Sequence, residues 1–348
     1  LKVQNFSSAT DSYNTAIGYK AGEAVTTGVQ NTIIGGLAGD ALTTGGGNVA
    51  IGYEALSTED AHGNNVAVGY RALKDLNVGA TGSNSALGYN AGANITTGIQ
   101  NTTIGANTGD ALTDADFNVA VGKGALSADT KGNKSVAVGV GALESQNFTS
   151  STDTFNTAVG LNAGNAVSTG QFNTFLGAGS GESNTTGAHN VTVGREAGYA
   201  NQTGGSNTYV GRSSGVAATG TSNTFVGRSS GSQVTSGANN TILGRYQGNS
   251  NSLDIRTADN RIVLSDGSGN PRLHINNNGF FTFSTNRSES TRKDSSTNHV
   301  IHSDRSAVIA FMESTASDPY GFMIDFSVAT PDDNQNYFFK GEDATAEE

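Results

Sequence analysis

A five-residue phrase recurs 14 times between residues 14 and 244 of the 348-residue chain, each time ending on Gly and 13 times opening on Asn. Ten of the 13 intervals between these glycines equal the first, from Gly18 to Gly35, and the exceptions are Gly69 to Gly88, Gly139 to Gly160 and Gly211 to Gly227. An array with a fixed short period, here about 17 residues, indicates stacked copies of one supersecondary unit. In the first seven copies the two repeat positions, expected to be structural, are Asn14 and Gly18, Asn31 and Gly35, Asn48 and Gly52, Asn65 and Gly69, Asn84 and Gly88, Asn101 and Gly105, and Asn118 and Gly122.

The middle of each phrase predicts a short strand with two apolar faces. The residue before the Gly is always aliphatic, and the residue three before it is Thr, Val or Ser. These two positions share one face, because side chains alternate along a strand. The residue between them is usually Ala, as at Ala67, and sometimes large, as at Phe175. A strand with no polar face is buried on both sides. We expect the Ala on the outer face, where it lets another chain approach closely.

One period accommodates two strands of about five residues and two tight turns, which is one coil of a narrow parallel β-solenoid. Thr-Gly or Ser-Gly closes many copies and is typical of a turn with positive φ, as at Gly28 and Gly98. A helical array is excluded, because Gly recurs every few residues among β-branched side chains. Coils stack at about 4.8 Å, so the 13 steps from Gly18 to Gly244 predict a rod of roughly 62 Å.

The copies also repeat in blocks of four. The fourth residue after the anchor Gly is Gly, Gly, Leu, Leu in the first block and again in the second. The first anchors of successive blocks are Gly18, Gly88 and Gly160, which are almost evenly spaced. Duplication of a four-coil unit is the simplest account of this pattern.

The row of Asn residues predicts a ladder of side-chain hydrogen bonds from coil to coil. A row of Asn could also bind a ligand, but a structural ladder is the more economical interpretation.

Composition limits the function. Lys and Arg number 19 against 30 Asp and Glu, so the net charge is −11, and this excess of acid disfavours nucleic acid as a partner. No apolar run approaches the ~18 residues of a membrane helix, so membrane insertion is not expected. Cys is absent, which removes disulfides and thiolate metal sites.

No group of residues predicts catalysis, a cofactor or a metal site. Asp114 and Asp116 fall in a variable turn, and no acid pair recurs with the repeat. His299 and His302 could ring a symmetry axis and bind metal, but they are more simply histidines of a polar linker. The loop at 265–270 resembles part of a calcium loop but lacks the bidentate Glu, so a turn is expected. We therefore expect no catalytic, cofactor-binding or metal-binding residues.

Changes in pattern divide the chain into five parts. Residues 1–11 are a lead-in, and residues 12–248 are the repetitive shaft. Residues 249–284 contain short alternating runs that predict a collar of antiparallel hairpins. Residues 285–305 are a polar linker or neck, and residues 306–348 begin a small distal β-domain that we expect to continue beyond residue 348. The chain is expected to be a piece of a longer polypeptide.

A narrow coil with an apolar outer stripe along its whole length needs a partner along its whole length. Three identical chains around a common axis satisfy this requirement and bury a continuous core. The sequence therefore predicts a homotrimer.

The phrases NTAIGYKAG at 14–22, NVAIGYEAL at 48–56 and NVAVGYRAL at 65–73 resemble two known families. They are similar to the head repeats of trimeric autotransporter adhesins, and more closely to arrays in bacteriophage tail fibres, including those of cyanophages. The first family implies a trimeric parallel β-roll.

The second family implies a fibre on the virion surface, outside the cell, that contacts other tail proteins and attaches to a host glycan or protein through a distal tip. The resemblance spans roughly residues 12–248. Two alternatives remain: a bacterial adhesin head, and a trimeric tailspike that degrades polysaccharide. The tailspike is disfavoured because sugar hydrolysis needs paired acids, with aromatic platforms to hold the sugar, whereas Trp is absent here.

Overall fold

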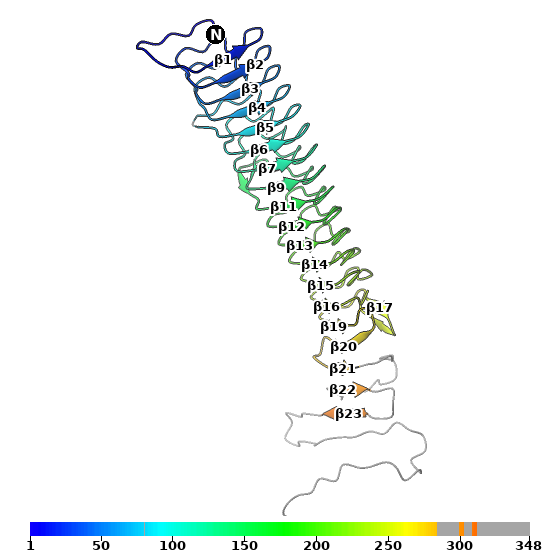
Figure 1. The fold of residues 1–348 in the computed structure, drawn as a ribbon. Helices are drawn as coiled ribbons and strands as arrows, with labels where there is room; N and C mark the ends of the chain where they lie inside the picture. The colour runs from blue at the N-terminus through cyan, green and yellow to red at the C-terminus, as the bar shows by residue number, and fades with distance from the viewer. Residues whose placement is uncertain (80, 284–298, 303–307, 312–348) are drawn as a thin grey trace, which may run out of the picture.

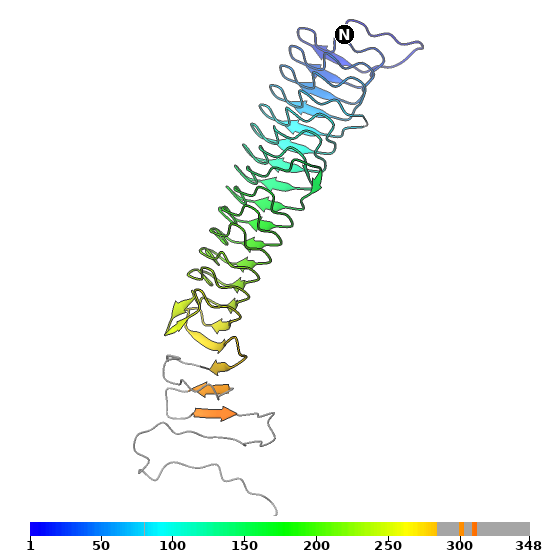
Figure 2. The ribbon, with the colours of Figure 1, turned by 180° about the vertical axis from the view of Figure 1, so that it is seen from behind.

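The computed structural model describes residues 1–79, 81–283, 299–302 and 308–311. These residues form an all-β protein with no helix, a parallel β-solenoid of about 15 turns with a period of about 17 residues. Figures 1 and 2 show the coils stacked in chain order along one axis, with β1 near one end. The prediction of a stacked solenoid is confirmed.

Each coil contributes one short strand to the main sheet, and β8 with β10 and β17 with β18 form two separate small sheets. The strands are β1 (Thr15–Ile17), β2 (Thr32–Ile34), β3 (Val49–Ile51), β4 (Val66–Val68), β5 (Ser85–Leu87), β6 (Thr102–Ile104), β7 (Val119–Val121), β8 (Gly132–Asn133), β9 (Val136–Val138), β10 (Thr152–Asp153), β11 (Thr157–Val159), β12 (Thr174–Leu176), β13 (Val191–Val193), β14 (Thr208–Val210), β15 (Thr224–Val226), β16 (Thr241–Leu243), β17 (Asn249–Ser250), β18 (Leu253–Asp254), β19 (Ile262–Ser265), β20 (Pro271–Ile275), β21 (Phe281–Phe283), β22 (His299–His302) and β23 (Val308–Phe311).

Successive strands pair in parallel without a register shift, so equivalent residues of the repeat lie above one another. Ala50 of β3 pairs with Ala67 of β4, for example. The expectation of two longer strands per coil is wrong, because residues with positive φ, such as Gln30 and Leu56, interrupt the extended backbone on either side of each strand. The turns stack instead through backbone hydrogen bonds, as from the Thr26 N–H to the Thr43 carbonyl at 2.9 Å. The positive φ expected at the closing glycines Gly28 and Gly98 is wrong. Gly is needed there because a Cβ on Gly28 would collide with the carbonyl oxygen of Gly45 in the next coil.

Two separate constraints require Gly at the anchor position. Gly18 has a φ of +132°, a conformation that L residues with a Cβ rarely adopt. A Cβ at this position would also lie 2.5 Å from the carbonyl oxygen of Gly35 in the next coil. Because the equivalent Gly stacks directly below in each coil, one substitution would separate two coils. The Gly therefore recurs without exception in 14 copies.

The Asn row forms a buried ladder that also closes each coil. The Asn31 N–H donates to the Oδ1 of Asn14 in the preceding coil at 2.9 Å. The Nδ2 of Asn31 donates to the carbonyl of Gly45 at 2.9 Å, near the end of its own coil. Asn31 is fully buried, so each of these bonds satisfies a backbone group that water cannot reach.

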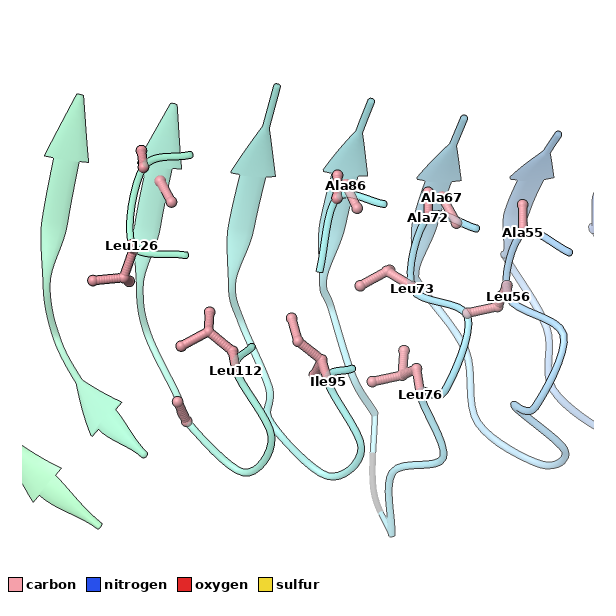
Figure 3. Close-up of a cluster of buried hydrophobic side chains, with 14 of the residues drawn as sticks. Ala55, Leu56, Ala67, Ala72, Leu73, Leu76, Ala86, Ile95, Leu112 and Leu126 are labelled. Carbon is pink, nitrogen blue, oxygen red and sulfur yellow. The ribbon is translucent and has the colours of Figure 1, made fainter. Parts of the chain in front are cut away.

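The interior of each coil holds the middle residue of the strand. Ala67 and Ala86 are 0% and 1% exposed within a single chain, and Figure 3 shows both on the side of the sheet that faces Leu73 and Ile95. The expectation that Ala lies on the outer face is therefore wrong. In such a narrow coil the strand position shares the interior with a second column of side chains from the opposite turns, such as Leu73 and Ile95.

Two positions of the repeat share the same part of the core, and a large residue at one is matched by a small residue at the other. Where the fourth residue after the anchor is Leu, as at Leu56, the inward strand residue is Ala, here Ala50. Where the inward residue is large, as at Phe175, the fourth residue is Gly, here Gly181. A Cβ on Gly181 would collide with the Phe175 ring. The two positions are thus never both large in one coil, although in five coils, such as the one with Ala86 and Gly92, both are small.

The parallel stack continues past residue 248. Ile262 of β19 pairs with Thr241 of β16, one rung beyond the last anchor Gly. From β19 the sheet turns antiparallel, through β20 and β21, and β17 pairs with β18 in a separate antiparallel hairpin.

Within the expected neck, His299–His302 forms β22, which pairs with β21 and β23. The rest of the expected neck and distal domain, apart from Val308–Phe311, lies outside the described residues.

The shared core volume predicts a strongly coupled pair. Phe175→Ala alone should destabilise the fold by about 3–5 kcal/mol through the cavity it leaves. Gly181→Leu alone should destabilise it by a clash. The double variant recreates the Ala and Leu arrangement of the third coil, so it should be more stable than the sum of the single effects predicts, by at least ~1 kcal/mol. Chemical denaturation of all four proteins measures this coupling. Additive effects would contradict the packing argument.

Register also predicts the effect of removing one block. Deletion of 18–87 joins Ile17 to Gly88, regenerates the phrase Asn-Thr-Ala-Ile-Gly and removes four coils. The rod should shorten by about 19 Å, four steps of the interstrand spacing. Small-angle X-ray scattering or electron microscopy measures the change. A control deletion of 18–79 is out of phase with the repeat, so the coils from Asn84 onward should still fold but Thr15–Ile17 should not join the stack.

Candidate interaction face

The exposed apolar side chains collect on one side of the repeat. Among the residues that the structure describes, all the exposed large apolar side chains except Leu1, Val3 and Tyr199 belong to four columns. Two columns are the outward positions of the strands, and the other two are the residue before the Asn and the residue after the anchor Gly. We call these columns the apolar strip; its members are Tyr13, Phe117, Phe155, Phe172, Val66, Val119, Val191, Ile262, Ile17, Leu87, Ile104, Leu176, Val226, Leu243, Leu264, Tyr19, Tyr53, Tyr70, Tyr89, Val140 and Leu161.

The strip results from the strand pattern. Outward positions such as Leu87 and Leu176 are 50% and 45% exposed, while the inward neighbours Ala86 and Phe175 are buried. Alternation along the strand separates the two sets, and the parallel register aligns each set from coil to coil. An exposed apolar surface that recurs over most of the coils marks an interaction site.

Aromatic rings stack along the two margins of the strip. Tyr70 lies between Tyr53 and Tyr89, with ring centroids 5.6 and 5.2 Å apart. On the other margin, Phe172 lies between Phe155 and His189, at 5.7 and 4.9 Å. These ladders form because equivalent positions recur at the spacing of the coils. These ladders were not predicted from the sequence, although a Tyr directly after the anchor Gly in four copies was a visible signal.

Two acids are buried inside the solenoid, at equivalent positions of the third and seventh coils. Glu59 accepts hydrogen bonds from the backbone N–H groups of Ala61 and His62, at 3.3 and 2.9 Å, and of Val78 in the next coil, at 3.4 Å. In both cases the next coil is one of the two that exceed the usual length of the repeat. The buried carboxylate therefore holds the backbone of an enlarged turn.

Asp129 is the equivalent acid of the seventh coil. Its Oδ1 accepts the N–H groups of Gly132 and Phe148 at 3.1 and 3.0 Å, and its Oδ2 accepts the Gln146 Nε2 at 2.6 Å. Gln146 also donates to the Oγ of Ser135, the residue that replaces Asn in the ladder. Burial raises the pKa of the Asp129 carboxyl group. This network maintains the hydrogen bonding where the Asn ladder is broken.

The other acids considered from the sequence have structural contacts. Asp114 lies 3.5 Å from Lys131, and Asp116 accepts the Ile99 N–H at 2.8 Å, so they act separately. Asp266 accepts hydrogen bonds from Asn270, which hold the pKa of its carboxyl group below the usual range, as expected for a turn.

One group in the described chain could bring metal-ligating atoms together. Glu59, Asp60 and His62 offer ligand atoms that lie within 4.8 Å of one another. The Glu59 carboxylate, however, already accepts three backbone N–H groups, and these bonds hold the turns. The group is therefore part of the turn, and we assign it no metal.

No family model, no curated protein and no solved structure matches this chain. The described residues contain no helix that is long and apolar enough to cross a membrane. The candidate site is therefore identified from the structure of this chain alone, and the structure indicates the apolar strip.

The raised pKa of Asp129 predicts a pH dependence of stability. A raised carboxyl pKa means that the folded state binds the proton more tightly than the unfolded state. The stabilisation that comes from this proton is full below about pH 3.8, and it is lost as pH rises through the folded pKa. Asp129→Asn keeps an acceptor for Gly132 and Phe148 but does not titrate. The wild-type advantage over this variant in unfolding free energy should therefore shrink from pH 4 to pH 7, as measured by urea denaturation.

The matched control for this prediction is Asp114→Asn, which removes the same charge from an exposed turn. A wild-type advantage over Asp129→Asn that grows with pH would show that Asp129 is held ionised instead.

Proposed function

We propose that this chain is the shaft of a homotrimeric fibre, of the kind found in bacteriophage tails, which projects a receptor-binding tip for attachment to a host cell. The observation that carries the proposal is the apolar strip, which runs from Tyr13 in the first coil to Leu264 beside the last parallel rung. A strip with members in 12 of the 14 coils, all but the second and the twelfth, favours assembly along the whole shaft and not at one end.

Identical chains arranged in parallel around a common axis present the same rung to one another at every height. Each chain then buries its strip against its neighbours, and the cyclic symmetry closes the assembly. Three thin solenoids joined in this way make a stiffer rod than one. The resemblance of the repeat to phage fibre arrays, and to trimeric adhesin heads, supports three as the number of chains.

A shaft of this type acts mechanically. It holds binding sites away from the particle, and three copies of a weak site bind a cell surface more tightly than one. The coils differ mainly in their turns, while the ladder of Asn and the anchor Gly are repeated, as expected for a spacer whose length is set by the number of coils.

Assembly through the strip is tested by Leu87→Lys combined with Ile104→Glu. These exposed residues lie on adjacent rungs, so within one chain the new charges attract each other and the coil should still fold. In the assembly, each rung would bring like charges from three chains together. Light scattering should give three times the 35.4 kDa chain mass for the wild type and a single chain mass for the variant, with unchanged circular dichroism.

The control is the same charge pair on adjacent rungs away from the strip, Gln202→Lys with Thr219→Glu, where both residues are exposed. This control should assemble like the wild type. A wild-type protein that is a stable soluble monomer would reject the proposal.

Attachment is tested separately from assembly. Antibodies against residues 12–248 should decorate fibres projecting from phage particles in electron micrographs. Decoration of a bacterial cell surface would support the adhesin head instead.

A further inference from the structure

Four arginines occupy the same position in four consecutive coils. Arg195, Arg212, Arg228 and Arg245 each follow directly after an anchor Gly, and the strands that precede them pair in register. The Ser213 N–H donates to the Arg195 carbonyl, and the Ser229 N–H donates to the Arg212 carbonyl, both at 2.8 Å. The backbones of these positions are thus bonded from coil to coil, at a spacing of about 4.8 Å. We call these four residues the arginine ladder.

The ladder has little opposing charge. Arg195 contacts Glu196 at 2.6 Å, but among the described residues no ion pair is formed by Arg212, Arg228 or Arg245. Arg212 and Arg228 are exposed, and Arg245 is half-buried with a buried Nε that has no hydrogen-bond partner. Residues 190–250 contain these four arginines, no Lys and a single acid, Glu196, in a chain with a net charge of −11.

Folding does not require arginine at this position. The same position holds Tyr53 in the third coil, Ala106 in the sixth and Leu161 in the ninth. Like charges directly opposite one another on neighbouring strands are destabilising. The ladder therefore repeats an unfavourable arrangement where an uncharged residue would serve.

A second copy of the chain does not supply the missing charge. In a parallel assembly with matched rungs, the coils that face the ladder are residues 190–250 of the neighbours, and their one acid, Glu196, already pairs with Arg195. Of the first three acids that follow the ladder, Asp254 pairs with Arg256, Asp266 pairs with Arg272, and Asp259 accepts the Ala238 N–H at 2.7 Å. The counter-charge must come from another molecule.

We propose that the arginine ladder binds an acidic polysaccharide that carries carboxylate or sulfate groups. Arg is suited to this task, because its planar guanidinium group forms paired hydrogen bonds with carboxylate and with the oxygens of sulfate or phosphate. Polysaccharide charges are separated by one or more sugar units and can pair with successive rungs. Duplex DNA carries about one charge per 1.7 Å, much denser than the rungs, and the acidic remainder of the chain repels it.

The ladder occupies the column after the anchor Gly, which in other coils forms one margin of the apolar strip. The inference therefore requires this margin to stay open to solvent in the proposed trimer, and each chain carries its own ladder. It adds a binding surface to the shaft, within coils that the deletion of 18–87 leaves in place.

The test measures binding of the full chain to alginate, which carries carboxylates, and to dextran sulfate, with neutral dextran and single-stranded DNA as comparisons. Biolayer interferometry at low and high salt should show salt-sensitive binding to one or both anionic polysaccharides. Binding to alginate alone, or to dextran sulfate alone, identifies which anionic group the ladder prefers.

The decisive variant is Arg212→Gln with Arg228→Gln and Arg245→Gln, which should weaken binding by at least about tenfold through loss of charge-assisted hydrogen bonds. The Lys version of this triple variant should recover part of the affinity. The control, Lys74→Gln with Lys131→Gln and Lys134→Gln, removes three charges that are paired with acids and should bind like the wild type. Arg228→Gln alone should give a partial loss, and it keeps the test valid if the triple variant does not fold.

Circular dichroism and light scattering on each variant separate loss of binding from loss of fold or of assembly. The proposal is overturned if the wild type binds neither anionic polysaccharide, if the Gln triple variant binds like the wild type, or if the chain prefers single-stranded DNA at the same salt concentration.

Discussion

Every feature of this protein depends on parallel stacking of the coils in register. Backbone hydrogen bonds join equivalent residues of neighbouring coils, both in the strands and in the turns. At the anchor the backbones approach so closely that a Cβ on Gly18 would meet the carbonyl of Gly35. A chain with such narrow coils has little apolar volume per coil, so it relies on polar ladders such as the one through Asn31 to satisfy its buried backbone.

Because the coils stack in register, a side chain that recurs at one position of the repeat forms a row along the surface. A single Tyr on the surface is common, but Tyr53, Tyr70 and Tyr89 become a stack of rings. One arginine is an ordinary surface charge, but four at consecutive rungs become a linear cationic site. A solenoid of this kind builds extended binding surfaces from single substitutions in the repeat, and such surfaces suit extended partners such as a second chain or a polymer.

Part of the candidate site could be predicted from the sequence. The aliphatic residues before each anchor Gly, such as Ile17 and Leu87, were visible as one apolar face of the strand. The stripe expected to contact other chains, however, was the opposite face, which carries Ala. The identity of the outer face was predicted wrongly, since both faces of the strand are apolar and alternation alone does not say which one points inward. The combinations of Leu56 with Ala50 and of Gly181 with Phe175 indicate which face points inward. In each of these two coils a large residue is matched by a small one, as expected when both side chains occupy the same interior. Ala67 consequently lies inside a single coil, and the residues on either side of it, Val66 and Val68, face outward.

The sequence by itself determined the period, the strand in each coil and the parallel stack, because a short fixed interval with an invariant Gly permits few other arrangements. Only the tertiary structure decided which side of the strand is enclosed, since enclosure depends on where the remainder of the coil closes. It also showed that the buried acids Glu59 and Asp129 hold the longer turns of the following coils, through contacts between residues up to 19 positions apart. Such contacts follow from the stacking of one coil on the next and have no local signature in the chain.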